Sequence, residues 1–299
     1  MQLYYYRRRD RQPNFGDELN IWLWPKLLPN CFNDDSAACF VGIGTVLNQR
    51  LPSRIADAKQ VFIFSSGVGY ETPLTKIPSH WQIFCVRGPR SAQQLGLSPN
   101  QAITDGGVLV RQCFRSIPSE HSNQPRIGFM PHIHHASSAQ AAWASLCQDA
   151  NLHYIDPRGS VDSILTAISQ TEVLYAEAMH GAIVADALRV PWVPVITSPR
   201  ILRFKWHDWC ESMQVPYQPQ ILSPIPDYPR YGRGLRSGGR ALFHWFQSGA
   251  FPIVQQRDSI LKQLTRLAQV EPVLSQNKIL EQRTESLLEA LALLKQKIQ

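Results

Sequence analysis

His180 is the residue whose type and position best fit catalysis. It follows a short apolar segment expected to form a strand, Val173–Tyr175, and precedes a helical pattern over Ala182–Leu188. In open parallel sheets, ligands collect at the carboxyl ends of strands, where helix N-termini present N–H groups to anions. An imidazole placed there can transfer protons or contact an anion. A buried or capping histidine is the alternative interpretation.

Two sets of cations lie at similar junctions. Arg87 comes where the apolar segment Ile83–Val86 meets a helical stretch, a place from which a guanidinium can hold phosphate or carboxylate through two bonds. Arg200, Arg203 and Lys205 follow the last predicted strand and alternate with aromatic residues. This mixture predicts a partly enclosed cationic pocket, with ordinary salt bridges or a solvated face as the alternatives.

The loops of the first half carry weaker signals. Asn14 and Asp17 suit the start of a helix, whereas Gly16 would let the backbone approach a ligand closely, and both interpretations stay open. Gly44 closes a Gly-x-Gly that lacks the full dinucleotide-binding pattern. Gly67 lies in a small-residue loop after another predicted strand.

Metal and disulfide chemistry are not expected. His132, His134 and His135 are close in sequence, but no Cys, Asp or Glu accompanies them at ligand spacing. The six cysteines are scattered without a C-x-x-C or a zinc spacing. Reduced, mostly buried thiols in a cytoplasmic protein are the simplest expectation.

Composition narrows the class of protein. A chain of 299 residues with 44% hydrophobic and 18% charged residues is expected to be soluble and globular, with two domains of ordinary size. No apolar run reaches the ~20 residues that span a bilayer, and the N-terminus lacks the features of a signal peptide. The net charge of +7 predicts an anionic partner, such as a phosphate ligand or a membrane surface. No nucleic-acid-binding motif is visible, so nucleic acid is not expected as a partner.

The elements that position these residues alternate between apolar strands and loops followed by helices, which is typical of an α/β protein with parallel sheets. We expect an N-terminal domain over residues 1–115, a polar linker over 116–125, a second domain over 126–235 and a helical segment over 236–299. The predicted strands cover residues 3–6, 40–47, 61–64, 83–86, 126–132, 152–155, 173–175 and 190–196.

Leucines at three- and four-residue spacing predict an amphipathic helix at the C-terminus, with Leu280, Leu287, Leu291 and Leu294 on one face. Its polar face carries both Glu and Lys, which argues against membrane attachment. The apolar face could pack onto the body of the chain or pair two copies in a homo-oligomer.

The chain resembles the polysaccharide pyruvyl transferase family, and within it the succinoglycan-type exopolysaccharide ketal-pyruvate transferases. The resemblance covers roughly residues 1–215 and rests on the order and spacing of several motifs. These motifs are Asn14-Phe15-Gly16-Asp17, Gly42-x-Gly44, Ser66-Gly67-Val68-Gly69, Val86-Arg87-Gly88-Pro89, Thr104-Asp105-Gly106-Gly107, Met130-Pro131-His132 and Ala176-Glu177-Ala178-Met179-His180-Gly181.

The resemblance implies a GT-B-like fold, in which two Rossmann-like domains face each other across a cleft. It implies transfer of the pyruvate unit of phosphoenolpyruvate to a sugar as a ketal, with phosphate released and no cofactor or metal. The acceptor would be an oligosaccharide, in lipid-linked form, and the enzyme would be cytoplasmic with a peripheral contact at the inner face of the membrane.

The resemblance also implies roles for single residues. His180 would be the acid/base or phosphate ligand. Because the chemistry needs a second proton-transfer group, we hypothesise that Asp17 or Glu18 reaches the acceptor hydroxyls from the other domain. Many relatives have Arg where Ala178 stands, so one anion contact must come from elsewhere. The expected donor-binding residues are Arg87, Lys205, Arg203, Arg200 and Gly181. The expected acceptor-side loop residues are Asn14, Gly16, Gly44 and Gly67.

Two other functions stay open at this point. A glycosyltransferase of the same architecture would keep the cleft and the cations but would need a site for a nucleotide sugar, and no carboxylate pair is clearly placed for one. A non-catalytic assembly protein in polysaccharide export would depend on its C-terminal helices and not on His180.

Overall fold

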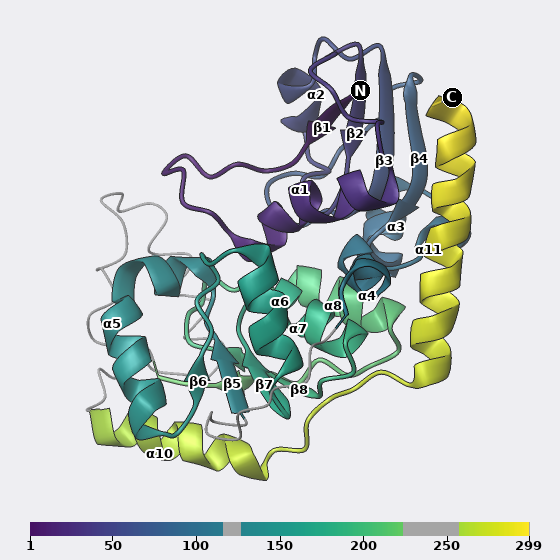
Figure 1. Cartoon of the computed structure of the whole chain (residues 1–299). Coiled ribbons are helices and arrows are strands. Elements are labelled where there is room, and N and C mark those ends of the chain that lie inside the picture. Colours follow the sequence, from purple (N-terminus) through teal and green to yellow (C-terminus); the bar gives the residue numbers. More distant parts are fainter. Residues whose placement is uncertain (116–126, 224–256, 299) are drawn as a thin grey trace.

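Two parallel β-sheets organise the chain, and the computed structural model describes residues 1–115, 127–223 and 257–298 (Figure 1). The first sheet has the strand order β1-β2-β3-β4 and the second the order β6-β5-β7-β8-β9. All pairings between these strands are parallel, which confirms the predicted α/β class. The strands are β1 (Gln2–Tyr4), β2 (Ala38–Val41), β3 (Gln60–Ser66), β4 (Trp81–Val86), β5 (Ile127–Met130), β6 (His153–Tyr154), β7 (Val173–Ala176), β8 (Trp192–Ile196) and β9 (Gln220–Ile221).

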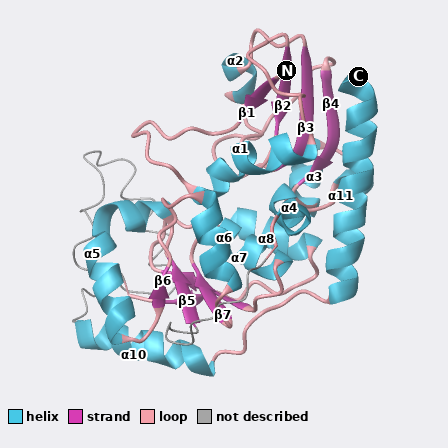
Figure 2. Cartoon of the chain, in the orientation of Figure 1, coloured by secondary structure: helices cyan, strands magenta, loops and turns pink. Residues whose placement is uncertain are grey.

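Helices lie in most of the connections between successive strands, as parallel pairing requires, whereas the link from β3 to β4 is a loop (Figure 2). Local sequence explains their ends: Ser160 caps α6 by accepting a hydrogen bond from Ser163 N–H, and Gly96 ends α3 in the left-handed region at φ 64°. The α-helices are α1 (Phe15–Leu27), α2 (Leu51–Arg54), α3 (Pro89–Leu95), α4 (Val110–Cys113), α5 (Ile133–Asp149), α6 (Val161–Ser169), α7 (Met179–Ala187), α8 (Arg203–Ser212), α10 (Arg257–Arg266) and α11 (Asn277–Ile298).

The first sheet is buried on both faces, which explains the continuous apolar runs of its strands. On one face, Trp24 of α1 packs edge-on against Phe40 and Phe64, with ring centroids 5.1 and 5.4 Å apart. On the other face, β3 contributes Val61 and Ile63 to a second apolar cluster. Because these strands are packed on both faces, the loops that follow their carboxyl ends are held in fixed positions.

The C-terminal helix α11 returns to the first sheet and runs beside β4 (Figure 1). The predicted apolar face is used there: Leu280, Leu287, Leu291 and Leu294 are buried against the body of the chain. Leu293, 57% exposed, lies outside that face. The predicted C-terminal amphipathic helix is thus confirmed, and pairing of two copies through it stays a prediction.

Some boundaries differ from the sequence-based expectation. The strand expected over 126–132 spans only Ile127–Met130. α5 then begins at Ile133, where the His132 side chain caps it by accepting a hydrogen bond from His134 N–H, and Ala139 marks a kink within the helix. α8 was not predicted. The linker expected at 116–125 and the boundary expected at 235 lie outside the described residues. None of the described helices has the length and apolar character needed to cross a bilayer.

Candidate active site

A pocket of about 840 Å³ is lined by loops from both sheets. From the first sheet come residues that follow β1, β2 and β3, including Gly44 and Tyr70. From the second come His132 after β5, His180 after β7 and Arg200 after β8. Because these residues all follow the carboxyl ends of parallel strands, the pocket lies where α/β folds ordinarily bind ligands.

His180 stands in the first turn of α7, where part of its ring faces the pocket and 15% of the side chain is exposed. Its ring lies against the backbone of α1, so that a Cβ added to Gly16 would overlap Nδ1 of the imidazole. Because Gly16 has no side chain, His180 from the half of the chain that contains the second sheet can reach helix α1, which packs on the first sheet. This is the close approach that the sequence allowed for Gly16, with a protein group in contact instead of a ligand.

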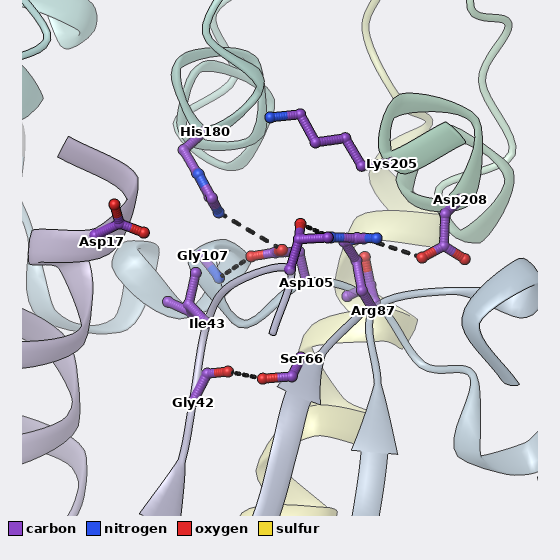
Figure 3. Close-up of polar contacts among 12 residues, drawn as sticks. Asp17, Gly42, Ile43, Ser66, Arg87, Asp105, Gly107, His180, Lys205 and Asp208 are labelled. Carbon is purple, nitrogen blue, oxygen red and sulfur yellow. Dashed lines mark hydrogen bonds and ion pairs between the residues drawn. The ribbon is translucent and has the colours of Figure 1, made fainter. Parts of the chain in front are cut away.

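Asp105 is the partner of His180 that sequence reasoning missed (Figure 3). The carboxylate is fully buried; Oδ1 accepts a hydrogen bond of 2.9 Å from Gly107 N–H, and Oδ2 lies 3.7 Å from His180 Nε2. Neither Oδ2 nor Nε2 has a hydrogen-bond partner among the described residues. An acid and an imidazole that face each other in this way can share a proton once a substrate tightens the contact. The signal was present, since Asp105 belongs to one of the motifs that carried the resemblance.

Asp17 adds a second carboxyl group to the pocket, at the start of α1. Burial raises the pKa of Asp17 to about 6. A hydrogen bond of 2.7 Å from the Asn14 amide and the nearby charges of His180 and Lys205 act in the opposite direction and lower this pKa. A carboxyl group that titrates near 6 can exchange protons at physiological pH. Asp17, Asn14 and His180 therefore line one pocket, and their roles stay predictions.

Three cations converge on the same pocket. Lys205, only 8% exposed, donates a hydrogen bond of 3.3 Å to the Tyr70 hydroxyl, and Arg200 lies beside it in the lining. Arg8, whose side chain is 13% exposed, is held by two hydrogen bonds to Asp10 of 3.0 and 2.5 Å. Arg8 was not predicted, because the arginine run after β1 has no motif character of its own.

The carboxyl ends of β5, β7 and β8 are tied together by Glu177, which is fully buried. It accepts hydrogen bonds from His132 N–H at 2.9 Å and from the N–H and hydroxyl of Thr197, both at 2.7 Å, and pairs with the His135 ring. Burial alone would raise the pKa of Glu177, but these donors hold it below its ordinary value. Burial and the charge of Lys205 lower the pKa of His132 well below its ordinary range, so a neutral imidazole lines the pocket.

Arg87 occupies a different position from the one expected of a donor ligand. It is fully buried and does not line the pocket. Its guanidinium donates to Asp208 at 2.9 Å, to the Thr45 hydroxyl at 2.7 Å and to the Val68 carbonyl at 2.7 Å (Figure 3). Asp208 belongs to α8 on the other sheet's side, so the pair joins the two halves and fixes two loops of the pocket wall. Contact between Arg87 and the donor stays a prediction.

The remaining predicted residues divide between the pocket and its surroundings. Gly44 lines the pocket, and Gly67 lies behind it against the Arg87 guanidinium. Glu18 faces a separate, smaller hollow of about 380 Å³ between α1 and α6. Arg203 is exposed and lies outside the pocket lining, and Gly181 packs on Met130. Their roles in binding stay predictions.

Comparison with known proteins shows which family the sequence of this chain matches. The family model described as polysaccharide pyruvyl transferase matches residues 4–199. The chain belongs to the polysaccharide pyruvyl transferase family. The matched range contains Arg8, Asp17, Asp105 and His180. Membership makes the chain a transferase that acts on a polysaccharide or its oligosaccharide precursor, and it confirms the resemblance stated from the motifs.

One relative supports the assignment to polysaccharide pyruvyl transferases. The succinoglycan biosynthesis protein ExoV of Rhizobium meliloti (strain 1021) is 39% identical over 223 residues, which span 74% of this chain and 67% of that protein. The similarity is therefore far above the level at which only a fold is shared.

Proposed function

We propose that this chain transfers the pyruvate unit of phosphoenolpyruvate to a sugar of an exopolysaccharide repeat unit, forming a cyclic ketal and releasing phosphate. The observation that carries the proposal is the convergence of a buried Asp105–His180 pair, the carboxyl group of Asp17 and the cations Lys205 and Arg8 on one pocket. The donor has one phosphate and one carboxylate, so it matches a pocket that combines cations with proton-transfer groups.

The family and its relative support the class of reaction, and the pocket supports the donor. Lys205 and Arg200 stand on the second sheet's side of the pocket, and Arg8 stands on the first. Arg8 is a candidate for the anion contact that relatives make with the arginine replaced here by Ala178, because Asp10 fixes its guanidinium next to His132 and His134. Protein cations can stabilise the charge on a leaving phosphate, so we propose no metal and no cofactor.

The chemistry requires one proton delivered to carbon and two removed from hydroxyls. Protonation of C3 of the donor makes C2 electrophilic. A first sugar hydroxyl loses its proton and bonds to C2, the C2–O bond to phosphate breaks, and a second hydroxyl, losing its proton, closes the ketal. Of the two hydroxyl protons, one balances the proton delivered to C3 and the other leaves with the phosphate.

We assign the proton transfers from the environments of the two acids. Asp17, with its pKa raised to about 6, is protonated often enough near neutral pH to supply the proton to C3. His180 removes the hydroxyl protons, and the buried carboxylate of Asp105, 3.7 Å from Nε2, stabilises the positive charge that forms on the ring. Glu177 is a positioning residue, because it holds the loops that carry His132 and Thr197.

The proposal extends to architecture and acceptor. The pocket is lined from the carboxyl ends of the strands of both sheets, which supports a GT-B-like arrangement of two Rossmann-like halves. The acceptor is an oligosaccharide of the repeat unit, in lipid-linked form. Its hydroxyls approach Asn14 and Gly44, which line the pocket.

Phosphate release tests the proposed function. The full chain is incubated with an oligosaccharide acceptor and either phosphoenolpyruvate or a nucleotide sugar, and phosphorus NMR follows the products. We expect inorganic phosphate from phosphoenolpyruvate only when acceptor is present, and none from a His180→Ala variant. Turnover of nucleotide sugars alone would instead make the chain a glycosyltransferase. Arg11→Gln, at an exposed position that does not line the pocket, serves as a control that should remain active.

A further inference from the structure

The pocket holds more positive charge than the proposed donor requires. Seven cationic residues line it against two carboxylates, those of Asp17 and Glu71. On the second sheet's side stand Arg200 and Lys205. On the first sheet's side stand Arg7, Arg8, Arg9, Arg50 and Arg54.

Two of the arginines on the first side are neutralised by neighbours. Arg8 pairs with Asp10 at 2.5 Å, and Arg50 pairs with Glu71 at 2.8 Å. The other three, Arg7, Arg9 and Arg54, are exposed and have no carboxylate partner among the described residues. Like charges gathered at one concave surface repel each other, and a bound anion would relieve that repulsion.

Phosphoenolpyruvate carries a charge of about −3 at neutral pH. Lys205 and Arg200 can balance about two of these charges, and Arg8, whose charge is already offset by Asp10, can still donate a hydrogen bond to the donor. The donor is a three-carbon molecule, and it fills only part of a pocket of about 840 Å³. The remaining space can hold an acceptor sugar, and the three unneutralised arginines line the same pocket. The charge left over therefore belongs to the acceptor.

The same wall offers surfaces that suit a sugar ring. Tyr5 and Tyr6 line the pocket next to the arginines, Tyr6 is 41% exposed, and the Arg7 guanidinium lies 5.0 Å from the centre of the Tyr5 ring. An aromatic face packs against the C–H face of a sugar, and a guanidinium beside it can bind an oxyanion on that sugar through two hydrogen bonds. A flat membrane surface could not enter this concave lining.

We infer that the acceptor is an acidic saccharide, and that Arg7, Arg9 and Arg54 bind its oxyanion, either a carboxylate or a phosphate. The inference rests on the proposed function, because that function places donor and acceptor together in this pocket. It gives a role to the arginine run after β1, which the transfer reaction itself leaves unused.

Calorimetric titration of the full chain tests the inference without turnover. The probes are cellobiose, cellobiouronic acid and cellobiose 1-phosphate, which share one backbone and differ in charge. We expect one or both acidic probes to bind about tenfold more tightly than cellobiose at low ionic strength. A variant carrying Arg7→Gln, Arg9→Gln and Arg54→Gln should lose this preference and keep its affinity for phosphoenolpyruvate within about twofold. The matched control is Arg11→Gln, an exposed arginine of the same segment that does not line the pocket.

Each outcome decides something. Preference for the uronic acid identifies a carboxylate, and preference for the phosphate identifies a phosphate. Equal binding of all three probes, or a preference that Arg11→Gln also removes, would overturn the inference. The inference would also be overturned if the triple variant lost binding to phosphatidylglycerol vesicles but kept its preference for the acidic saccharides. If the chain bound acidic saccharides but released no phosphate from phosphoenolpyruvate, the proposed reaction would fall and this site would stand.

Discussion

The imidazole of His180 and the carboxylate of Asp105 face each other across the two halves of the chain, with Nε2 and Oδ2 3.7 Å apart. Asp105 follows the strands of the first sheet, whereas His180 begins the helix after β7 of the second. The pair exists only when the two halves are docked. Docking of the halves is thereby coupled to the assembly of the acid/base group.

Replacing Asp105 by Asn tests that coupling. The amide keeps the acceptor for Gly107 N–H but removes the negative charge next to His180 Nε2. We expect kcat for phosphate release to fall by about 10²- to 10⁴-fold, the range for loss of acid/base assistance, with little change in the KM for phosphoenolpyruvate. Steady-state kinetics measures both. An unchanged kcat would show that Asp105 only caps the turn at Gly106.

Gly16→Ala is expected to inactivate the enzyme without touching any group that reacts. The added Cβ overlaps the His180 ring, so either the ring or the start of α1 must move. A displacement of about 1 Å in an active site can cost about 10²-fold in rate. Gly159→Ala is the control, because its Cβ would meet no atom nearer than 3.2 Å. Equal activity of the two variants would contradict the observed packing of His180.

Asp17→Asn should make the protein more stable at neutral pH and less active. The folded state raises the pKa of Asp17 from 3.8 to about 6, so it binds this proton more tightly than the unfolded state does. The stabilisation from that proton is fully present below about pH 4 and is lost as pH rises through 6. At pH 7 the variant should therefore gain on the order of 2 kcal/mol in the free energy of unfolding, and about none at pH 4. Urea unfolding at both pH values measures the gain in the free energy of unfolding. Equal gains at pH 4 and pH 7 would contradict the raised pKa of Asp17.

The Arg87→Met variant distinguishes a structural role for Arg87, through its pair with Asp208, from a role in binding the donor. Arg87→Met leaves Asp208 buried without its cation, which should lower the free energy of unfolding by about 3 kcal/mol or more. Arg90→Met breaks an exposed pair between Arg90 of α3 and Glu211 of α8, and it should cost less than about 1 kcal/mol. Chemical denaturation measures both variants. If Arg87→Met instead kept its stability and raised the KM for phosphoenolpyruvate, Arg87 would be a donor ligand, as the family resemblance implies.

Sequence reasoning predicted the parts of this molecule that depend on local pattern. Apolar strands followed by glycine loops predicted two parallel sheets, and the position of His180 between β7 and α7 follows from strand and helix patterns. The contact between His180 and Asp105 could not be predicted, because it depends on how two halves far apart in sequence dock. The burial of Arg87 was hidden for the same reason: its partner Asp208 lies 121 residues further along the chain, in a helix that no pattern predicted.

The pocket wall formed by residues 5–9 was also beyond sequence reasoning. A run of tyrosines and arginines after an edge strand has no periodicity, so only the path of the loop shows that it faces the pocket. The presence of Lys205 and Arg200 in the pocket lining was easier to predict, since both follow the carboxyl end of β8, where ligands collect in parallel sheets.

Proton NMR of the product formed in D₂O tests the central claim most directly. The full chain is incubated with phosphoenolpyruvate and an acidic oligosaccharide acceptor, and the new methyl signal on the saccharide is examined. Protonation at C3 predicts a ketal methyl group with one deuteron, formed in step with inorganic phosphate and absent with His180→Ala. A product that retains its vinyl protons, or no transfer of the three-carbon unit at all, would contradict the account.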